Sequence, residues 1–111
     1  MAHENMKACI DACFKCAQEC EHCGDACIGD RAMAACAKSC RDCAEFCLTC
    51  VAFLSRGSQF ADGLCALCAE ACDACAVECG KHNNDHCRRC AKACEQCAKE
   101  CRQVASVGAA A

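Results

Sequence analysis

Residues 65–101 read CALCAEACDACAVECGKHNNDHCRRCAKACEQCAKEC, and the spacing of cysteine in this stretch decides the fold. From Cys65 to Cys79, and again from Cys87 to Cys101, the steps between successive cysteines alternate between three and four residues. This alternation is the a and d pattern of a heptad repeat, which places one residue type along a single stripe of an α-helix. Each half of the stretch therefore predicts one helix with a stripe of cysteine facing its partners.

The same spacing extends over the whole chain, which contains 21 cysteines in 111 residues. Gly, Asp, Ser and Asn occur between the blocks of cysteine, and these residues end one helix and cap the next. The four blocks are Cys9, Cys13, Cys16, Cys20, Cys23 and Cys27; Cys36, Cys40, Cys43, Cys47 and Cys50; Cys65, Cys68, Cys72, Cys75 and Cys79; and Cys87, Cys90, Cys94, Cys97 and Cys101. The expected helices span about residues 3–28, 31–55, 59–80 and 85–104.

Short connections make neighbouring helices antiparallel, and the absence of proline leaves the helices without a kink. We therefore expect an all-α protein, an antiparallel up-down-up-down four-helix bundle with a cysteine-lined core. The 111 residues suffice for a single domain, and we expect a flexible, Ala-rich tail after the last helix.

Composition and charge indicate the cellular compartment of the protein and exclude some classes of partner. The first residues carry charges throughout and do not resemble a secretory signal, and every candidate segment is too polar to span a membrane. A net charge of -3 with both signs interspersed does not suit a nucleic-acid partner. We therefore expect a cytoplasmic protein, in a compartment that keeps thiols reduced.

The cysteines predict metal binding and not disulfides. Residues three or four apart on a helix have Cβ atoms about 5–6 Å apart, whereas a disulfide needs about 3.5–4.5 Å. The odd number of cysteines also excludes complete intramolecular pairing. Two metal–sulfur bonds of about 2.3 Å each span about 4.6 Å, so each helix offers a ladder of two-sulfur clamps, eight of which are CxxC.

Thiolate-only sites select Cu(I), zinc or iron–sulfur clusters. The loops and the following proline of common iron–sulfur motifs do not occur here. An isolated zinc ion with four thiolates has two excess negative charges, which are costly to bury repeatedly. Cu(I) with one thiolate per ion is neutral, so the spacing favours multiple Cu(I) ions over zinc or cadmium.

The two ends of the predicted bundle differ. One end continues the stripe with apolar residues, namely Met6, Leu54 and Val104, with Phe53, Phe60 and Leu64 close by, and we expect them to close it. At the other end Met33 and His82 continue the stripe, and His86 precedes Cys87. Met33, His82 and His86 are therefore candidate metal ligands at an open mouth, whereas His22 is expected to point outward. The apolar residues outside the stripe predict an oligomer contact, and they are Ile10, Phe14, Phe46, Leu48 and Val51.

From Cys9 to Cys101 the chain resembles the copper storage proteins, which are bacterial four-helix bundles whose inward-pointing cysteines bind Cu(I). The resemblance is carried by the segments CFKCAQECEHCGDAC, CRDCAEFC and CALCAEACDACAVECGKHNNDHCRRCAKACEQC. It implies that metal enters at the mouth around His82 and His86 and that the protein assembles as a homotetramer. The second block departs from the family as we know it, because cysteine fills every stripe position there.

The sequence therefore predicts a cytosolic Cu(I) storage protein for sequestration, detoxification and supply. No catalytic constellation is recognisable, so we do not expect an enzyme. A metallothionein-like zinc or cadmium buffer is the first alternative. A thiol oxidoreductase is the second, although its CxxC motif normally begins a helix that follows a strand, and no strand is predicted.

Overall fold

The computed structural model describes the backbone of residues 2–110 and the side chains of residues 6–106. Four long helices follow one another along the chain, and a short 3-10 helix, η1 (Arg31–Met33), precedes the second of them. The long helices are α1 (Ala2–Ala26), α2 (Ala34–Ser55), α3 (Ala61–Cys79) and α4 (Asp85–Ala110). Within the described residues there is no strand, which confirms the all-α prediction.

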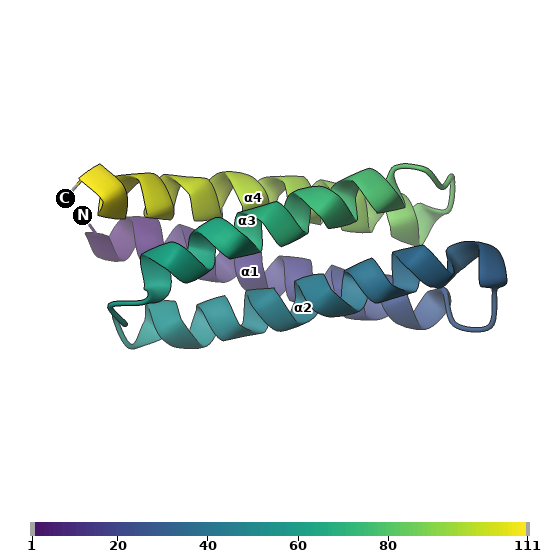
Figure 1. The fold of residues 1–111 in the computed structure, drawn as a ribbon, viewed down its shortest axis with the longest axis horizontal. Helices are drawn as coiled ribbons and strands as arrows, with labels where there is room; N and C mark the ends of the chain where they lie inside the picture. Colours follow the sequence, from purple (N-terminus) through teal and green to yellow (C-terminus); the bar gives the residue numbers. More distant parts are fainter. Residues whose placement is uncertain (1, 111) are drawn as a thin grey trace.

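The four helices form an elongated bundle of 45 × 19 × 18 Å (Figure 1). Each helix packs against the next in the chain, and α1 also packs against α4. The diagonal pair α2 and α4 meets through side chains, as at Cys47 and Cys97, whose Sγ atoms are 3.8 Å apart. Both termini and the α2–α3 connection lie at one end in Figure 1, and the other two connections lie at the opposite end. This arrangement confirms the predicted antiparallel up-down-up-down topology.

The connections use glycine where the backbone becomes left-handed. Gly29 and Gly57 have φ angles of 93° and 65°, which other residues rarely adopt. Gly80 differs, because it ends α3 with a right-handed φ of −64°. Asp30 accepts a hydrogen bond from the Ala32 N–H at 3.0 Å, so it caps η1 and not an α-helix. The α-helical part of the second helix therefore begins at residue 34 and not at 31.

The last helix is longer than the sequence suggested. It continues to Ala110, whereas we expected a helical end near residue 104 and a flexible tail beyond it. The residues that follow Val104 include several alanines and no proline, and the single glycine among them, Gly108, does not end the helix. Of the expected tail, residue 111 lies outside the described part.

The end that contains the termini is closed by apolar side chains, as predicted. Leu54 and Val104 are buried, and Met6, Phe53 and Leu64 pack partly buried against the core. Phe60 is the exception, because its side chain is 65% exposed. It occupies the capping position just before α3, where the chain turns and the side chain no longer lies on the inner face.

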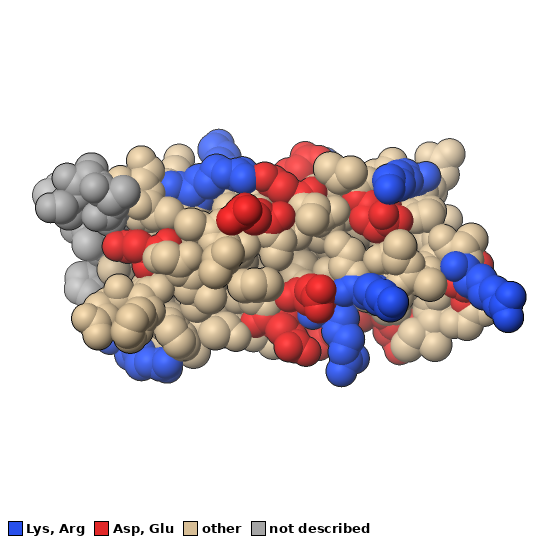
Figure 2. All heavy atoms as spheres, viewed as in Figure 1, with Lys and Arg blue, Asp and Glu red and all other residues tan. Residues whose placement is uncertain are grey.

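Charged residues cover the outside of the bundle, and Figure 2 shows both signs interspersed over the face in view. Among the residues with described burial, Glu19 is the only buried charged one. Its carboxylate lies 3.2 Å from Lys15 Nζ and 3.2 Å from an Arg89 nitrogen, so it links α1 to α4. No described helix has a stretch that is both long and apolar enough to cross a lipid bilayer.

Candidate metal centre

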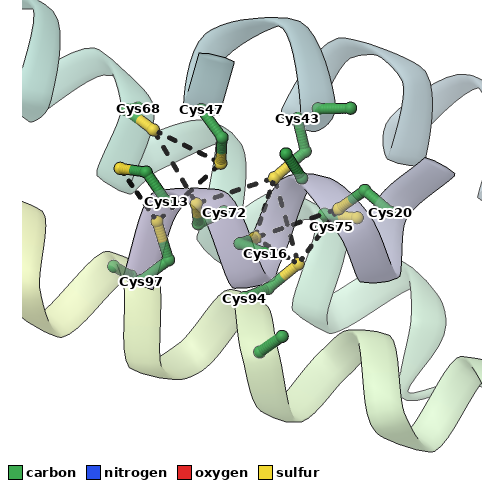
Figure 3. Packing of buried hydrophobic residues seen from close by; sticks show 14 of the residues in the cluster. Cys13, Cys16, Cys20, Cys43, Cys47, Cys68, Cys72, Cys75, Cys94 and Cys97 are labelled. Atoms are coloured by element: carbon green, nitrogen blue, oxygen red, sulfur yellow. Dashed lines mark hydrogen bonds between the residues drawn. The ribbon is translucent and has the colours of Figure 1, made fainter. Parts of the chain in front are cut away.

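A continuous column of thiols fills the interior of the bundle. All 21 cysteines are at most 1% exposed, and none forms a disulfide. Figure 3 shows sulfur atoms from all four helices pointing toward one another across the axis. The predicted cysteine-lined core is therefore confirmed, and heptad spacing explains it because every stripe position faces the neighbouring helices.

The sulfurs are closest to one another between helices. Cys36 and Cys79 Sγ are 3.5 Å apart, linking α2 to α3 near the mouth. Near the middle of the bundle, Cys16 Sγ lies 3.7 Å from Cys94 and 3.8 Å from Cys43. These separations are van der Waals and weak hydrogen-bonding contacts, far longer than the roughly 2.05 Å of a disulfide. The column is therefore a stack of free thiols that share neighbours.

Within one helix, sulfur contacts join cysteines four residues apart and not the expected CxxC pairs. The same-helix sulfur contacts within 4.0 Å all join described residues four apart, and none belongs to a CxxC pair. Residues four apart on an α-helix differ by about 40° in direction, whereas residues three apart differ by about 60°. The i,i+4 thiols therefore converge more readily, and the CxxC thiols need a rotamer change to act as clamps.

Several groups of four sulfurs are compact enough to hold a metal ion. Cys13, Cys47, Cys68 and Cys97 contribute one sulfur from each helix, and all four sulfurs lie within 4.8 Å of one another. Further groups of this size share members with it or with one another. They include Cys13, Cys50, Cys68 and Cys101; Cys16, Cys43, Cys47 and Cys72; Cys16, Cys20, Cys43 and Cys94; and Cys20, Cys75, Cys90 and Cys94. Shared members make the groups one overlapping system, in which a thiolate can bridge two ions.

The sulfur separations match known metal–thiolate bonds. Three sulfurs at the corners of a triangle with sides of about 3.9 Å lie about 2.3 Å from its centre, which is the length of a zinc–thiolate bond. The cross-helix contacts of 3.6–3.8 Å at Cys13, Cys16 and Cys43 are close to this spacing. A tetrahedral four-thiolate site needs about 3.8 Å between sulfurs, so geometry alone accommodates zinc as well as Cu(I).

The thiols nearest the mouth retain their protons at neutral pH. Burial is the main cause that raises the pKa values of Cys23 and Cys87. Burial also raises the pKa of Cys27 to about 12. A metal ion that binds there must displace protons, so its apparent affinity depends on pH.

His86 joins the thiols to the outside of the mouth. Its Nδ1 lies 3.2 Å from Cys23 Sγ and 3.5 Å from Cys87 Sγ. On the other side of the ring, Nε2 lies 3.3 Å from the Asn84 side-chain nitrogen. The structure thus brings His86 into the thiol cluster, where the sequence placed it. Asn84 was missed, because nothing in its spacing relates it to the stripe.

His82 and Met33 also lie at the mouth, but less directly against the thiols. His82 Nε2 is buried, lies 3.5 Å from Glu78 Oε2 and has no hydrogen-bond partner among the described residues. Met33 is 5% exposed and belongs to the same buried cluster as the cysteines. His22 was expected to point outward and is exposed, yet its ring centroid lies only 6.4 Å from that of His86.

A four-helix bundle whose interior is an unbroken column of free thiols, with imidazoles at one end, defines a class of protein that binds many soft metal ions. Comparison with known proteins identifies the family within this class. The family model described as copper storage protein matches residues 2–106. The chain belongs to the copper storage protein family.

Individual relatives agree with this assignment. The uncharacterized cysteine-rich protein YhjQ of Bacillus subtilis is 43% identical over 85 residues, covering 74% of this chain and 79% of that protein. The Cu(I)-bound copper storage protein BsCsp3 is 42% identical with a TM-score of 0.87, covering 91% of this chain and 98% of that one. A cytosolic copper storage protein of Streptomyces lividans, studied with five coppers, is 34% identical with a TM-score of 0.89, covering 95% of both chains.

Proposed function

We propose that this protein stores many Cu(I) ions in its interior, for sequestration, detoxification and supply to recipient proteins. The observation that carries this proposal is the column of 21 buried, unpaired thiols. A protein that bound one structural ion would need about four of them. The copper-loaded relatives support the choice of metal.

Charge favours Cu(I) over a zinc or cadmium buffer. A buried Lys or Arg could neutralise an anionic thiolate cluster. Among the residues with described burial, however, no Lys or Arg is buried. A Cu(I) thiolate at one ion per sulfur carries no net charge, whereas each isolated tetrathiolate zinc site carries two negative charges. Burying several such dianions in this core would cost far more free energy.

The ligands are the 21 cysteine thiolates, with His86, His82 and Met33 completing sites at the mouth. His86 is supported by its two contacts with thiol sulfur. His82 is supported by a buried ring nitrogen at the mouth, which lies 3.5 Å from Glu78 Oε2 without forming a hydrogen bond to a described residue. Met33 is supported by its burial in the cysteine cluster, and its thioether is a soft ligand suited to Cu(I).

The protein acts in the cytosol, by binding and not by catalysis. Reduced thiols persist in that compartment, and the Streptomyces lividans relative is described as cytosolic. Its partners are copper ions and a protein that delivers or receives them. We do not expect nucleic acid or membranes among them, because a net charge of -3 with both signs along the chain offers little attraction for anionic phosphates.

A homotetramer is the assembly that we propose. Phe14 and Leu48 are 52% and 45% exposed, so both offer apolar surface to a contact between subunits. Phe46 lines a groove with Leu64 on the α3 side of α2, so the apolar residues outside the stripe do not share one hollow. Light scattering tests this assembly, and a monomeric mass at micromolar concentration would reject it.

Anaerobic metal competition tests the proposed function. The reduced protein is titrated with Cu(I) and with Zn(II) in the presence of a chelator for each ion. We expect it to bind on the order of one Cu(I) per thiol and Cu(I) to displace bound zinc. Saturation at about four or fewer Cu(I) ions would mean that at most about four thiolates bind copper at one ion each, and it would overturn the proposal. Displacement of Cu(I) by zinc would also overturn it.

A further inference from the structure

Two His-Cys dipeptides meet at the mouth, one from α1 and one from α4. His22 precedes Cys23, and His86 precedes Cys87. The two sulfurs lie 3.8 Å apart, and the two imidazole rings lie edge to face with centroids 6.4 Å apart and an interplanar angle of 79°. The pair of histidines thus lies beside a pair of thiols of the same layer.

The two rings differ in exposure and form a path inward. His22 is exposed, whereas His86 is half-buried. His86 directs Nδ1 toward Cys23 and Cys87, at 3.2 and 3.5 Å, and its Nε2 lies beside Asn84, an exposed residue. An ion that enters beside these rings can bind an imidazole before it reaches Cys23 or Cys87, because both thiols are fully buried.

The spacing of the rings suits one shared ion. An imidazole nitrogen lies about 1.1 Å from the ring centroid, and metal–imidazole bonds are about 2.0 Å long. Two imidazoles that bind one ion in a linear arrangement therefore have centroids about 6 Å apart. The observed separation of 6.4 Å is close to this value, and because the rings lie edge to face, one of them has to turn to present a nitrogen to the ion. Imidazole is an established copper ligand, and Cu(I) accepts two-coordinate sites.

We propose that His22 and His86 form a two-imidazole receiving site for Cu(I), from which the ion passes to Cys23 and Cys87. This inference rests on the proposed storage function and adds His22, an outward-facing residue, to the entry path. In the transfer two Cu–N bonds break and two Cu–S bonds form. The two thiols release their protons to water, and the copper remains Cu(I). Thiolate is the softer ligand, so the transfer runs inward.

The test is the rate of uptake from a Cu(I)–bicinchoninate complex, followed anaerobically by stopped flow as the chelator colour fades. His22→Phe keeps an aromatic ring at the same place but removes the ring nitrogens, and we expect the initial rate to fall about tenfold. His22→Met supplies a soft thioether and should recover most of the rate. Gln18→Ala, one turn away on the same exposed side of α1, is the control and should match the wild type. The number of Cu(I) ions held by the thiols should stay unchanged in all three variants.

A second measurement does not depend on the variants. Once the thiols of the wild-type protein are saturated with Cu(I), one further equivalent should shift the ring 15N resonances of both His22 and His86. An initial uptake rate of His22→Phe equal to that of the wild type, or a His22 ring whose 15N resonances do not shift, would overturn the proposed receiving site. Neither result would contradict the proposed storage function. Failure of the storage proposal itself would be distinct, because the wild-type capacity would then be low.

Discussion

At the scale of single residues, the interior thiols act collectively because each one has several sulfur neighbours. Cys16 is typical, since it contacts Cys20, Cys43 and Cys94 at 3.7–3.9 Å. Such a thiolate can bridge two ions, so its loss affects more than one site. A hydroxyl of nearly the same size cannot replace it, because an alkoxide is a hard ligand and a poor partner for Cu(I).

Cys16→Ser should therefore lower the Cu(I) capacity by about one to two ions, with the helical content of the apoprotein unchanged. The measurement is copper per protein after loading and gel filtration. Gln18→Ser places the same hydroxyl at an exposed position of α1 and should leave the capacity unaltered. A wild-type capacity in Cys16→Ser would show that Cys16 is only a packing residue.

The mouth thiols also predict how the stability of the apoprotein depends on pH. Burial raises the pKa of Cys27 to about 12 from its ordinary value of 9.0. In the unfolded chain this thiol ionises near its ordinary value, while the folded protein still holds the proton. Its contribution to stability is therefore complete below about pH 9 and is lost as the pH rises toward 12.

We expect the free energy of unfolding of the apoprotein, measured in urea at constant ionic strength, to fall between pH 9 and about 12. Cys27→Ser cannot ionise and should show a shallower decline over that window. An equally steep decline in both proteins would assign the pH dependence to other groups.

At the scale of helices, the close approach of α1 and α2 depends on a glycine. A Cβ atom at Gly24 would lie 3.4 Å from the Cβ of Cys40, which is at the tight limit of ordinary packing. Gly24 also lines an open groove with Ala37 and Lys38, so a larger side chain has to turn into that groove to avoid Cys40. A methyl group fits there without this restriction.

Gly24→Leu should therefore destabilise the apoprotein by about 1 kcal/mol, because the new side chain is restricted to one direction beside Cys40. Gly63 provides a matched control, because it lies in α3 and a Cβ atom added there would have no neighbouring atom within 4 Å. Gly63→Leu should be neutral or stabilise by about 0.5 kcal/mol through helix propensity. Equal effects in thermal or urea unfolding would show that the α1–α2 contact is not tightly packed.

The periodicity of cysteine was sufficient to predict the helices, their order and the thiol core, because a stripe repeated at helical spacing can be buried in only one way. Three features depended on information that the pattern lacks. Phe60 lies outside the core because the capping position of α3 turns away, and α4 continues past Val104 because no residue stops it. The proximity of His22 to His86 depends on how α1 and α4 align, which spacing along one helix does not determine.

At the scale of the whole molecule, the protein is a closed tube with two unlike ends. Leu54 and Val104 close one end with ordinary apolar packing, and Met33, His82 and His86 cover the other. Because this apolar packing and the four helices need no metal, the apoprotein should be folded, with helical far-UV circular dichroism in the presence of a chelator. A flat helical signal would contradict this expectation.

Loading should then raise the stability of an already folded protein. Ions that bind the folded tube and not the unfolded chain stabilise it by about 2.7 kcal/mol at a free concentration about 100-fold above the dissociation constant. The thermal midpoint should therefore increase progressively with each added equivalent of Cu(I). A midpoint that does not change on loading would place the copper outside the bundle.

The most direct test of the central claim is the position of copper in the loaded protein. Anomalous diffraction at the copper edge locates each ion independently of the protein density. We predict peaks along the whole axis of the tube, from the Cys9–Cys101 layer to the Cys23–Cys87 layer, with every ion between these layers bound to thiolate sulfur. Peaks confined to the mouth, or copper only on the outer surface, would contradict the account.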